Sequence, residues 1–239
     1  MMFLSKLSLN LKSRAVQRDL ADCQAIHRRI MAAFPQALAG ANAREHFGVL
    51  YRLDFDRSGA FLLIQSRVKP DWSQLPSDYV SGGVPGESKE VAAAYAGLAV
   101  GRVLAFRLRA NVTRKIDTKS GPDGKRRHGA RVEVWDNDRQ LEWLALKGAA
   151  AGFEVVTAQV NGGKQYPAVR ANPGGKTWGQ KGKAGADEAK EGVRVTFGGV
   201  VFEGLLRITN TTEFREALAK GIGPAKAYGF GLLTVAPPR

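Results

Sequence analysis

The stretch that decides the fold lies near the end of the chain and reads Gly221-Ile-Gly-Pro-Ala-Lys-Ala-Tyr-Gly-Phe-Gly-Leu-Leu233. Glycine adopts positive φ and lets another backbone approach closely, and successive exposed N–H groups can form a concave anion site. We therefore expect a loop that either binds an anion or packs between other segments, ahead of an apolar strand. The glycines and the single lysine of this loop are Gly221, Gly223, Gly229, Gly231 and Lys226.

The loop does not match the common nucleotide-binding motifs. A P-loop requires a glycine, four further residues and then Gly-Lys-Ser/Thr. The chain has Gly175-Lys176-Thr177, but Arg170 stands where the first glycine belongs. A dinucleotide fingerprint that began at Gly221 would need a glycine at the position of Lys226. Both motifs are excluded.

The composition indicates a basic, well-packed protein. Lys and Arg number 36 against 22 Asp and Glu, so the net charge is +14 and the expected anion is a phosphodiester backbone. A hydrophobic content of 44% excludes wholesale disorder. No continuous apolar stretch is long enough to span a membrane, so we expect no membrane association. The single cysteine, Cys23, excludes internal disulfides and fits a reducing cytoplasm.

Outward from the glycine loop, apolar periodicity predicts the same order of elements twice. In the first half we expect strands at 3–11, 48–55, 60–66 and 91–100, a helix at 19–34 and a short helical turn at 71–75. In the second half we expect strands at 102–110, 153–160, 193–209 and 230–236, with helices at 137–151 and 210–221. The segment 162–192, rich in Gly and Lys, is expected to be a surface loop.

Each half thus approximates β-α-β-β-α-β. The predicted fold class is α+β, with two tandem ferredoxin-like (βαββαβ), RRM-like domains at residues 1–97 and 98–239.

Basic residues cluster at 102–131, where ten Lys or Arg stand against two Asp. Like charges repel, so such a cluster points to an anionic partner, whereas any single member could be an ordinary solvated side chain. Within it, 124–129 resembles a hairpin tip that could enter a groove of a nucleic acid. The candidate RNA-binding residues are Arg28, Arg29, Arg107, Arg109, Arg114, Lys115, Lys125, Arg126, Arg127, Arg131 and Lys226.

His27 is the strongest candidate for acid–base chemistry. It follows Ile26 on the predicted first helix, at the edge of the buried stripe. An imidazole moves protons well near neutral pH, and neighbouring arginines could stabilise developing negative charge. A lone helical histidine is nevertheless usually structural. Cys23 lies one turn earlier and could pair with it, although a lone helical cysteine is usually buried filler. No spacing predicts a metal site.

Taken together, these features resemble the CRISPR-associated endoribonucleases of the CasE family, from subtype I-E systems. The resemblance extends over nearly the whole chain and is strongest at 2–7, 13–15, 18–20, 26–28, 106–111, 201–204 and 221–237. At the position of the family's histidine stands His27. Some members have a tyrosine three residues earlier, where this chain has Gln24.

The resemblance implies metal-independent cleavage of CRISPR precursor RNA at the base of the repeat stem-loop, with no cofactor and with the hairpin product kept bound. It also implies a place among the other subunits of the Cascade complex. The expected products carry a 2′,3′-cyclic phosphate and a 5′-OH, because the 2′-OH of the RNA is the nucleophile. The alternative is a non-catalytic RNA-binding subunit on the same fold. A small-molecule enzyme is a third hypothesis, which rests only on the glycine loop.

Overall fold

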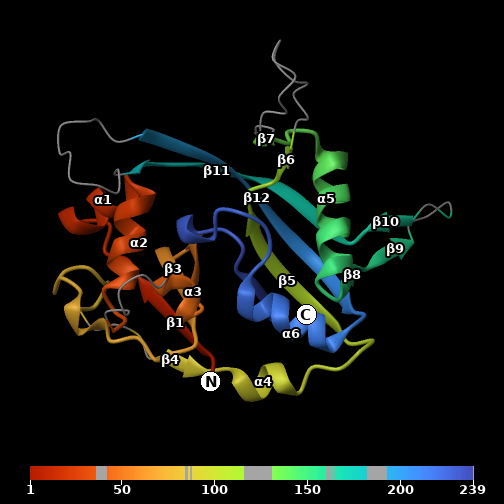
Figure 1. The fold of residues 1–239 in the computed structure, drawn as a ribbon, viewed down its shortest axis with the longest axis horizontal. Coiled ribbons are helices and arrows are strands. Elements are labelled where there is room, and N and C mark those ends of the chain that lie inside the picture. Colours follow the sequence, from red (N-terminus) through yellow and green to blue (C-terminus); the bar gives the residue numbers. More distant parts are fainter. Residues whose placement is uncertain are drawn as a thin grey trace, which may run out of the picture.

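In the part of the chain that the structure describes, the two larger antiparallel sheets, each flanked by helices, stand side by side (Figure 1). The computed structural model describes residues 1–35, 42–83, 86, 88–115, 131–159, 163, 165–181 and 193–238. The α+β class predicted from the sequence is confirmed.

The first sheet has the strand order of a ferredoxin-like domain, β2-β3-β1-β4. Its strands are β1 (Phe3–Ser8), β2 (Leu50–Asp56), β3 (Gly59–Ser66) and β4 (Ser88–Glu90). A 3-10 turn, η1 (Trp72–Gln74), takes the place of the second helix. The structure confirms the predicted strands at 3–11, 48–55 and 60–66 and the turn at 71–75, with bounds that differ by one to three residues.

The single helix predicted at 19–34 is wrong. The structure has α1 (Arg14–Leu20) and α2 (Cys23–Met31), followed by the short α3 (Ala43–His46). The side chain of Asp22 accepts a hydrogen bond from the amide of Gln24 and so begins a new helix there. His27 consequently lies in the middle of α2.

The strand predicted at 91–100 is also wrong, because this segment forms the helix α4 (Ala92–Ala96). Alanine has the highest intrinsic helix propensity, and three alanines in a row open this helix. The edge strand that completes the first sheet is the preceding β4, which pairs with β1.

The second sheet repeats the same order, β11-β12-β5-β13, with β8 paired to the far end of β12. Its strands are β5 (Val103–Ala110), β8 (Phe153–Val155), β11 (Val169–Lys181), β12 (Val193–Ile208) and β13 (Leu233–Ala236). The helices α5 (Asn137–Ala150) and α6 (Thr211–Lys220) supply the two crossovers, as predicted. Two ferredoxin-like units in tandem are therefore confirmed.

The surface loop predicted at 162–192 is wrong for its described part. β10 (Gln165–Pro167) pairs with β9 (Thr157–Gln159), and β11 then runs for thirteen residues along β12. The pairing register shifts between Pro173 and Lys176, where the strand has a bulge. Three of the glycines that suggested a loop, Gly174, Gly175 and Gly179, belong to this irregular strand.

Two short strands flank the most basic segment. β6 (Thr113–Lys115) and β7 (Arg131–Glu133) pair antiparallel. The predicted tip at 124–129 lies outside the described residues.

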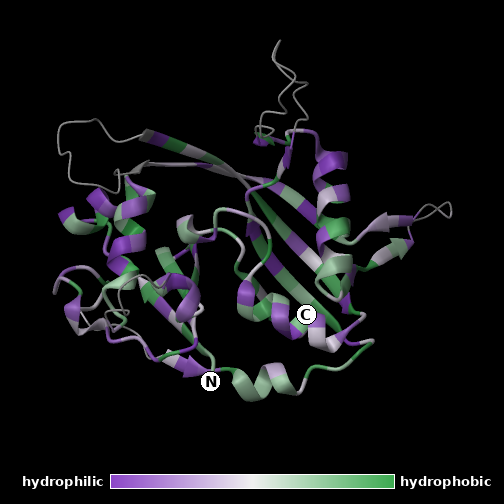
Figure 2. Ribbon diagram, viewed as in Figure 1, coloured by the Kyte–Doolittle hydropathy of each residue, from purple (hydrophilic) through white to green (hydrophobic). Residues whose placement is uncertain are grey.

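Each sheet has its own apolar core. One cluster surrounds Leu7, Ile30 and Ile64, and the other surrounds Leu108, Phe202 and Phe214. Figure 2 shows hydrophobic and hydrophilic residues alternating along β5 and β12, as expected for strands with one buried face. The domain boundary between residues 97 and 98 remains a prediction.

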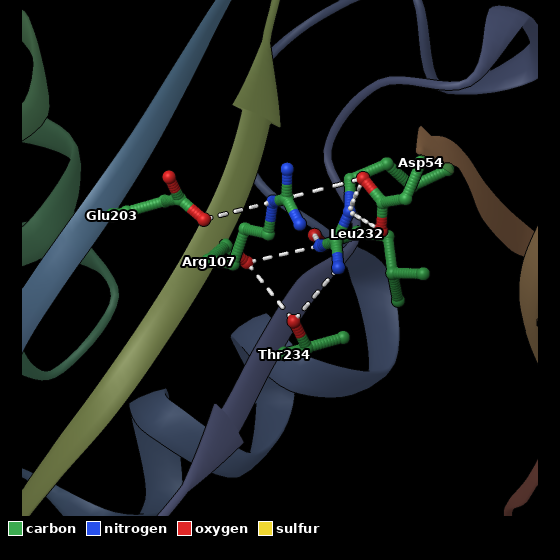
Figure 3. A network of polar contacts seen from close by, with 6 residues as sticks. Asp54, Arg107, Glu203, Leu232 and Thr234 are labelled. Atoms are coloured by element: carbon green, nitrogen blue, oxygen red, sulfur yellow. Dashed lines mark hydrogen bonds and ion pairs between the residues drawn. The ribbon is translucent and has the colours of Figure 1, made fainter. Parts of the chain in front are cut away.

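A buried ion pair within β2 holds an arginine that reaches into the second domain (Figure 3). The Nε of Arg52 donates to both carboxylate oxygens of Asp54 at 2.9 and 2.7 Å, and the two side chains are 3% and 4% exposed. The terminal nitrogens of Arg52 donate across the domain interface to the carbonyls of Arg107 and Leu232 and to the hydroxyl of Thr234, each at 3.1 Å. The terminal nitrogens of this buried guanidinium thereby fix β2 against the second domain, while its Nε pairs with Asp54 within β2.

Candidate functional site between the domains

His27 lies on α2, at the border between the buried face of the helix and its surface. Its ring is partly buried, and its Nδ1 is buried without a hydrogen-bond partner among the described residues. Burial lowers the pKa of the imidazole, and the positive charges of Arg44 and Arg28 lower it further. The imidazole is therefore neutral at neutral pH.

The glycine loop lies beside α2 and packs between the two domains. Gly221, Gly223, Gly229 and Gly231 all have positive φ, as does Ala225 at the start of the 3-10 turn η2 (Lys226–Tyr228). A Cβ on Gly231 would lie 2.8 Å from the carbonyl oxygen of Ile222, so only glycine fits this fold-back. The loop therefore has a packing role.

Three contacts connect this loop to its surroundings. The Nε2 of Gln24 on α2 donates to the hydroxyl of Tyr228 at 2.9 Å. The ring of Tyr228 stacks on Phe197 with 4.7 Å between the ring centroids. The hydroxyl of Tyr51, on β2, donates to the carbonyl of Ala227 at 3.0 Å. The helix that carries His27 and the loop that carries Lys226 are thus held together by side chains from both domains.

Arg44 and Arg28 are the cations whose charges lower the pKa of His27, and Arg44 also acts on Lys226. Burial lowers the pKa of the Lys226 ammonium, and the charge of Arg44 lowers it further. The Nη1 of Arg44 donates to the carbonyl of Val49 at 3.3 Å, and this hydrogen bond holds the guanidinium in place. Sequence reasoning missed Arg44, because it belongs to no motif and only the tertiary fold brings it near α2. A neutral base beside these cations can accept a proton while they stabilise an anion.

Cys23 is not suited to act as a nucleophile. It is 3% exposed, and burial together with the charge of Asp22 raises the pKa of its thiol to about 11. A Cβ on Gly179 of β11 would lie 2.7 Å from its sulfur, so the strand backbone packs directly over it. The side chain acts as packing where the second domain meets α2.

A cavity of about 420 Å³ opens between the domains, with Tyr228 of η2 on its lining. Cys23 and Ile26 of α2 line it, as do Arg107 and Arg109 of β5. The Nη2 of Arg109 donates to the carbonyl of Gly174 at 2.9 Å and to the hydroxyl of Thr177 at 2.8 Å.

The remaining candidate RNA contacts lie in several places. Arg28 is exposed, with Asp22 3.8 Å away, whereas Arg29 donates to the buried Asp19 at 2.8 Å. Exposed side chains on the hairpin of β6 and β7 belong to Arg114, Lys115 and Arg131. Lys125, Arg126 and Arg127 lie outside the described residues. The RNA-binding roles of all these residues stay predictions.

Among the residues that the structure describes, no three His, Cys, Asp or Glu side chains come together as a metal site. Within the same ranges no helix is both long and apolar enough to cross a bilayer.

Fold and site together define the class: a tandem ferredoxin-like protein with a histidine and several cations where its domains meet. A family model described as "CRISPR associated protein" matches residues 2–237. The chain belongs to this family of CRISPR-associated proteins and, within it, to the CasE endoribonucleases.

Individual relatives cover the whole chain. It is 31% identical over 238 residues to the CRISPR-associated endoribonuclease Cse3 of Thermus thermophilus, with 99% of this chain and 100% of the relative aligned. It is 30% identical over 239 residues to the CRISPR system Cascade subunit CasE of Escherichia coli, with the same coverage. A structure of CRISPR endoribonuclease Cse3 bound to 19 nt RNA superposes with a TM-score of 0.70 at 30% identity, covering 99% of each chain.

Proposed function

We propose that the protein cleaves CRISPR precursor RNA without a metal ion, at the base of the repeat stem-loop, and that His27 is its catalytic residue. The assignment of His27 is supported by its partly buried ring on α2, whose Nδ1 has no hydrogen-bond partner among the described residues, and by the charges of Arg44 and Arg28, which with burial lower its pKa. A Thermus thermophilus Cse3 structure bound to an RNA representing a pre-cleavage complex, 29% identical with a TM-score of 0.70, supports the substrate class.

The chemistry needs three contributions from the protein. The 2′-OH must be aligned with the scissile phosphorus, it must lose a proton, and the negative charge that develops on the phosphate must be stabilised. Because His27 is neutral at neutral pH, it is suited to accept the proton as general base. Arg44 and Lys226 are suited to the third task. As the 2′ oxygen bonds to phosphorus, the bond between phosphorus and the 5′ oxygen breaks and that oxygen takes up a proton from water, so the products are a 2′,3′-cyclic phosphate and a 5′-OH.

Recognition of the stem rests on charge. The A-form major groove hides base edges from side chains, so a repeat stem is read through its phosphates and shape. Arg114, Lys115 and Arg131 on the exposed hairpin of β6 and β7 are the described residues best suited to contact phosphates. The product hairpin remains bound, and the protein serves as a subunit of the Cascade complex, as the name of the Escherichia coli relative supports.

The test compares two histidines on a repeat hairpin in the presence of EDTA. His27→Ala should lower the single-turnover cleavage rate at least 100-fold, in line with the loss of a general base, while the dissociation constant for the RNA stays unchanged. His46→Ala is the matched control, because His46 is exposed and lies on α3. It should cleave like the unmodified protein.

Two results would contradict the proposal. Undiminished cleavage by His27→Ala would remove this residue from the mechanism. An unmodified protein that binds the hairpin tightly but never cuts it would favour the non-catalytic RNA-binding subunit.

A further inference from the structure

The cavity of about 420 Å³ between the domains is not needed for the proposed proton transfer, yet it begins one residue from His27. Ile26 of α2 lines it on one side and Tyr228 of η2 on another. Its volume falls in the range of small-ligand sites, and it is far too small for an RNA stem. Its volume therefore suits a ligand of about the size of one nucleotide.

Two aromatic side chains on its lining are unusually exposed. Phe55 at the end of β2 is 65% exposed, and Trp178 on β11 is 49% exposed. The guanidinium carbon of Arg194 lies 5.0 Å from the Trp178 ring centroid. Large apolar rings left open to solvent beside cations are the usual platform for unpaired nucleobases, because every base has a face that can stack.

Arg107 supplies a charged group to the same cavity. Figure 3 shows its guanidinium between the carboxylates of Asp54 and Glu203. Both ion pairs are made through Nε, at 3.6 and 3.2 Å. Among the described residues neither terminal nitrogen of Arg107 has a hydrogen-bond partner, so a two-pronged donor is available for a phosphate or a base edge.

We propose that this cavity holds one unpaired nucleotide of the single strand that flanks the repeat stem, with its base stacked on Trp178 or Phe55 and its polar edge or phosphate on Arg107. This inference rests on the proposed function, since it presumes that the flanking strand leaves the stem beside His27. The cavity would then hold the strand on one side of the scissile linkage and help to set the cut position.

The test is a binding comparison with RNA that carries a 2′-deoxyribose at the scissile position and so cannot be cleaved. One RNA is trimmed to the stem, a second has a 5′ single-stranded extension, and a third has a 3′ extension. Trp178→Ala and Phe55→Ala should each weaken binding of one extended RNA by about 5- to 100-fold, the loss expected when a base stack is removed. The extension that loses affinity identifies the strand in the cavity.

In this comparison the trimmed RNA should bind all variants equally. The control variant is Tyr166→Ala, which removes another exposed aromatic residue and should leave the affinity for all three RNAs unchanged. Equal losses for trimmed and extended RNA, or no loss at all, would overturn the inference. Because the measurement needs no cleavage, it stands apart from the His27→Ala test. A protein whose His27→Ala variant still cuts would refute the catalytic proposal and leave the cavity result intact.

Discussion

At the scale of the residue, the proposed cleavage mechanism depends on the charge state of one imidazole. His27 was identified from its place on the first helix, and the structure adds the reason why it is neutral at neutral pH: burial, together with Arg44 and Arg28. Sequence reasoning could find the histidine and its two neighbouring arginines. Sequence reasoning could not find Arg44, because this residue lies well beyond α2 in the sequence and comes near His27 only through tertiary packing.

The first prediction concerns pH. A base whose pKa is lowered loses its function only when the solution becomes acidic enough to protonate it. The single-turnover cleavage rate should therefore stay high as the pH falls to the ordinary histidine value of about 6.5, and should decline only below it. Rates measured from pH 5 to 8 check this. A decline that begins above pH 7 would mean that the relevant imidazole has a raised pKa.

Arg44 gives a second prediction at this scale. Arg44→Gln removes a positive charge that opposes protonation of His27, so the acid limb of the rate profile should move to higher pH. Arg44→Lys retains the charge and should leave the limb in place, which separates electrostatics from the hydrogen bond to Val49. If the acid limb of the rate profile of Arg44→Gln stays at the same pH, the charge of Arg44 does not affect the pKa of the catalytic group.

At the scale of the element, periodicity predicted the order of most strands and helices but not their partners. The strands β5 and β3 and the helices α5 and α6 have strong local signals, and they formed as predicted. The Gly- and Lys-rich β11 has no such local signal. It is a strand because β12, sixteen residues long, offers it a ladder of hydrogen bonds. Long-range pairing of this kind leaves no trace in local composition. The break between α1 and α2 does have a local signal, because Asp22 is a residue type that caps the start of a helix.

The contact between α2 and η2 gives a third prediction. Tyr228→Phe or Gln24→Leu removes the hydrogen bond that ties the helix of His27 to the loop of Lys226. Each change should lower the cleavage rate about tenfold, equivalent to one hydrogen bond of ~1.4 kcal/mol. The double variant should lose no more than either single one.

Two measurements separate positioning from a general loss of structure in this case. The dissociation constant for the hairpin and the melting temperature should both stay close to those of the unmodified protein. Tyr166→Phe, on the exposed β10, serves as the control. Additive losses in the double variant would show that Gln24 and Tyr228 act separately.

At the scale of the whole molecule, two domains of the same topology must keep one relative placement, because the site draws on both. The loop of Lys226, the helix of His27 and the strand of Tyr51 meet where they join. The tandem arrangement could be predicted from repeated periodicity. The hydrogen bonds from the buried Arg52 that fix it could not be predicted, since Arg52 and Asp54 look like ordinary charges on a strand.

Asp54→Asn gives the fourth prediction. It leaves the guanidinium of Arg52 buried without its counter-ion, so the free energy of unfolding should fall by about 3–5 kcal/mol. Glu154→Gln removes one partner of an exposed pair with Arg207 and should cost less than ~1 kcal/mol. Chemical denaturation measures the free energy of unfolding of both variants and of the unmodified protein. Equal, small losses would show that the buried pair does not hold the domains together.

The central claim is that the RNA supplies its own nucleophile and the protein moves the proton. The most direct measurement is the chemical identity of the two ends made by cleavage in EDTA, determined by mass spectrometry beside a substrate with a 2′-deoxyribose at the scissile position. We predict that cleavage of the ribose substrate leaves a 2′,3′-cyclic phosphate and a 5′-OH, and that the 2′-deoxyribose substrate is not cleaved. A 3′-OH with a 5′-phosphate, or cutting of the deoxy substrate, would contradict it.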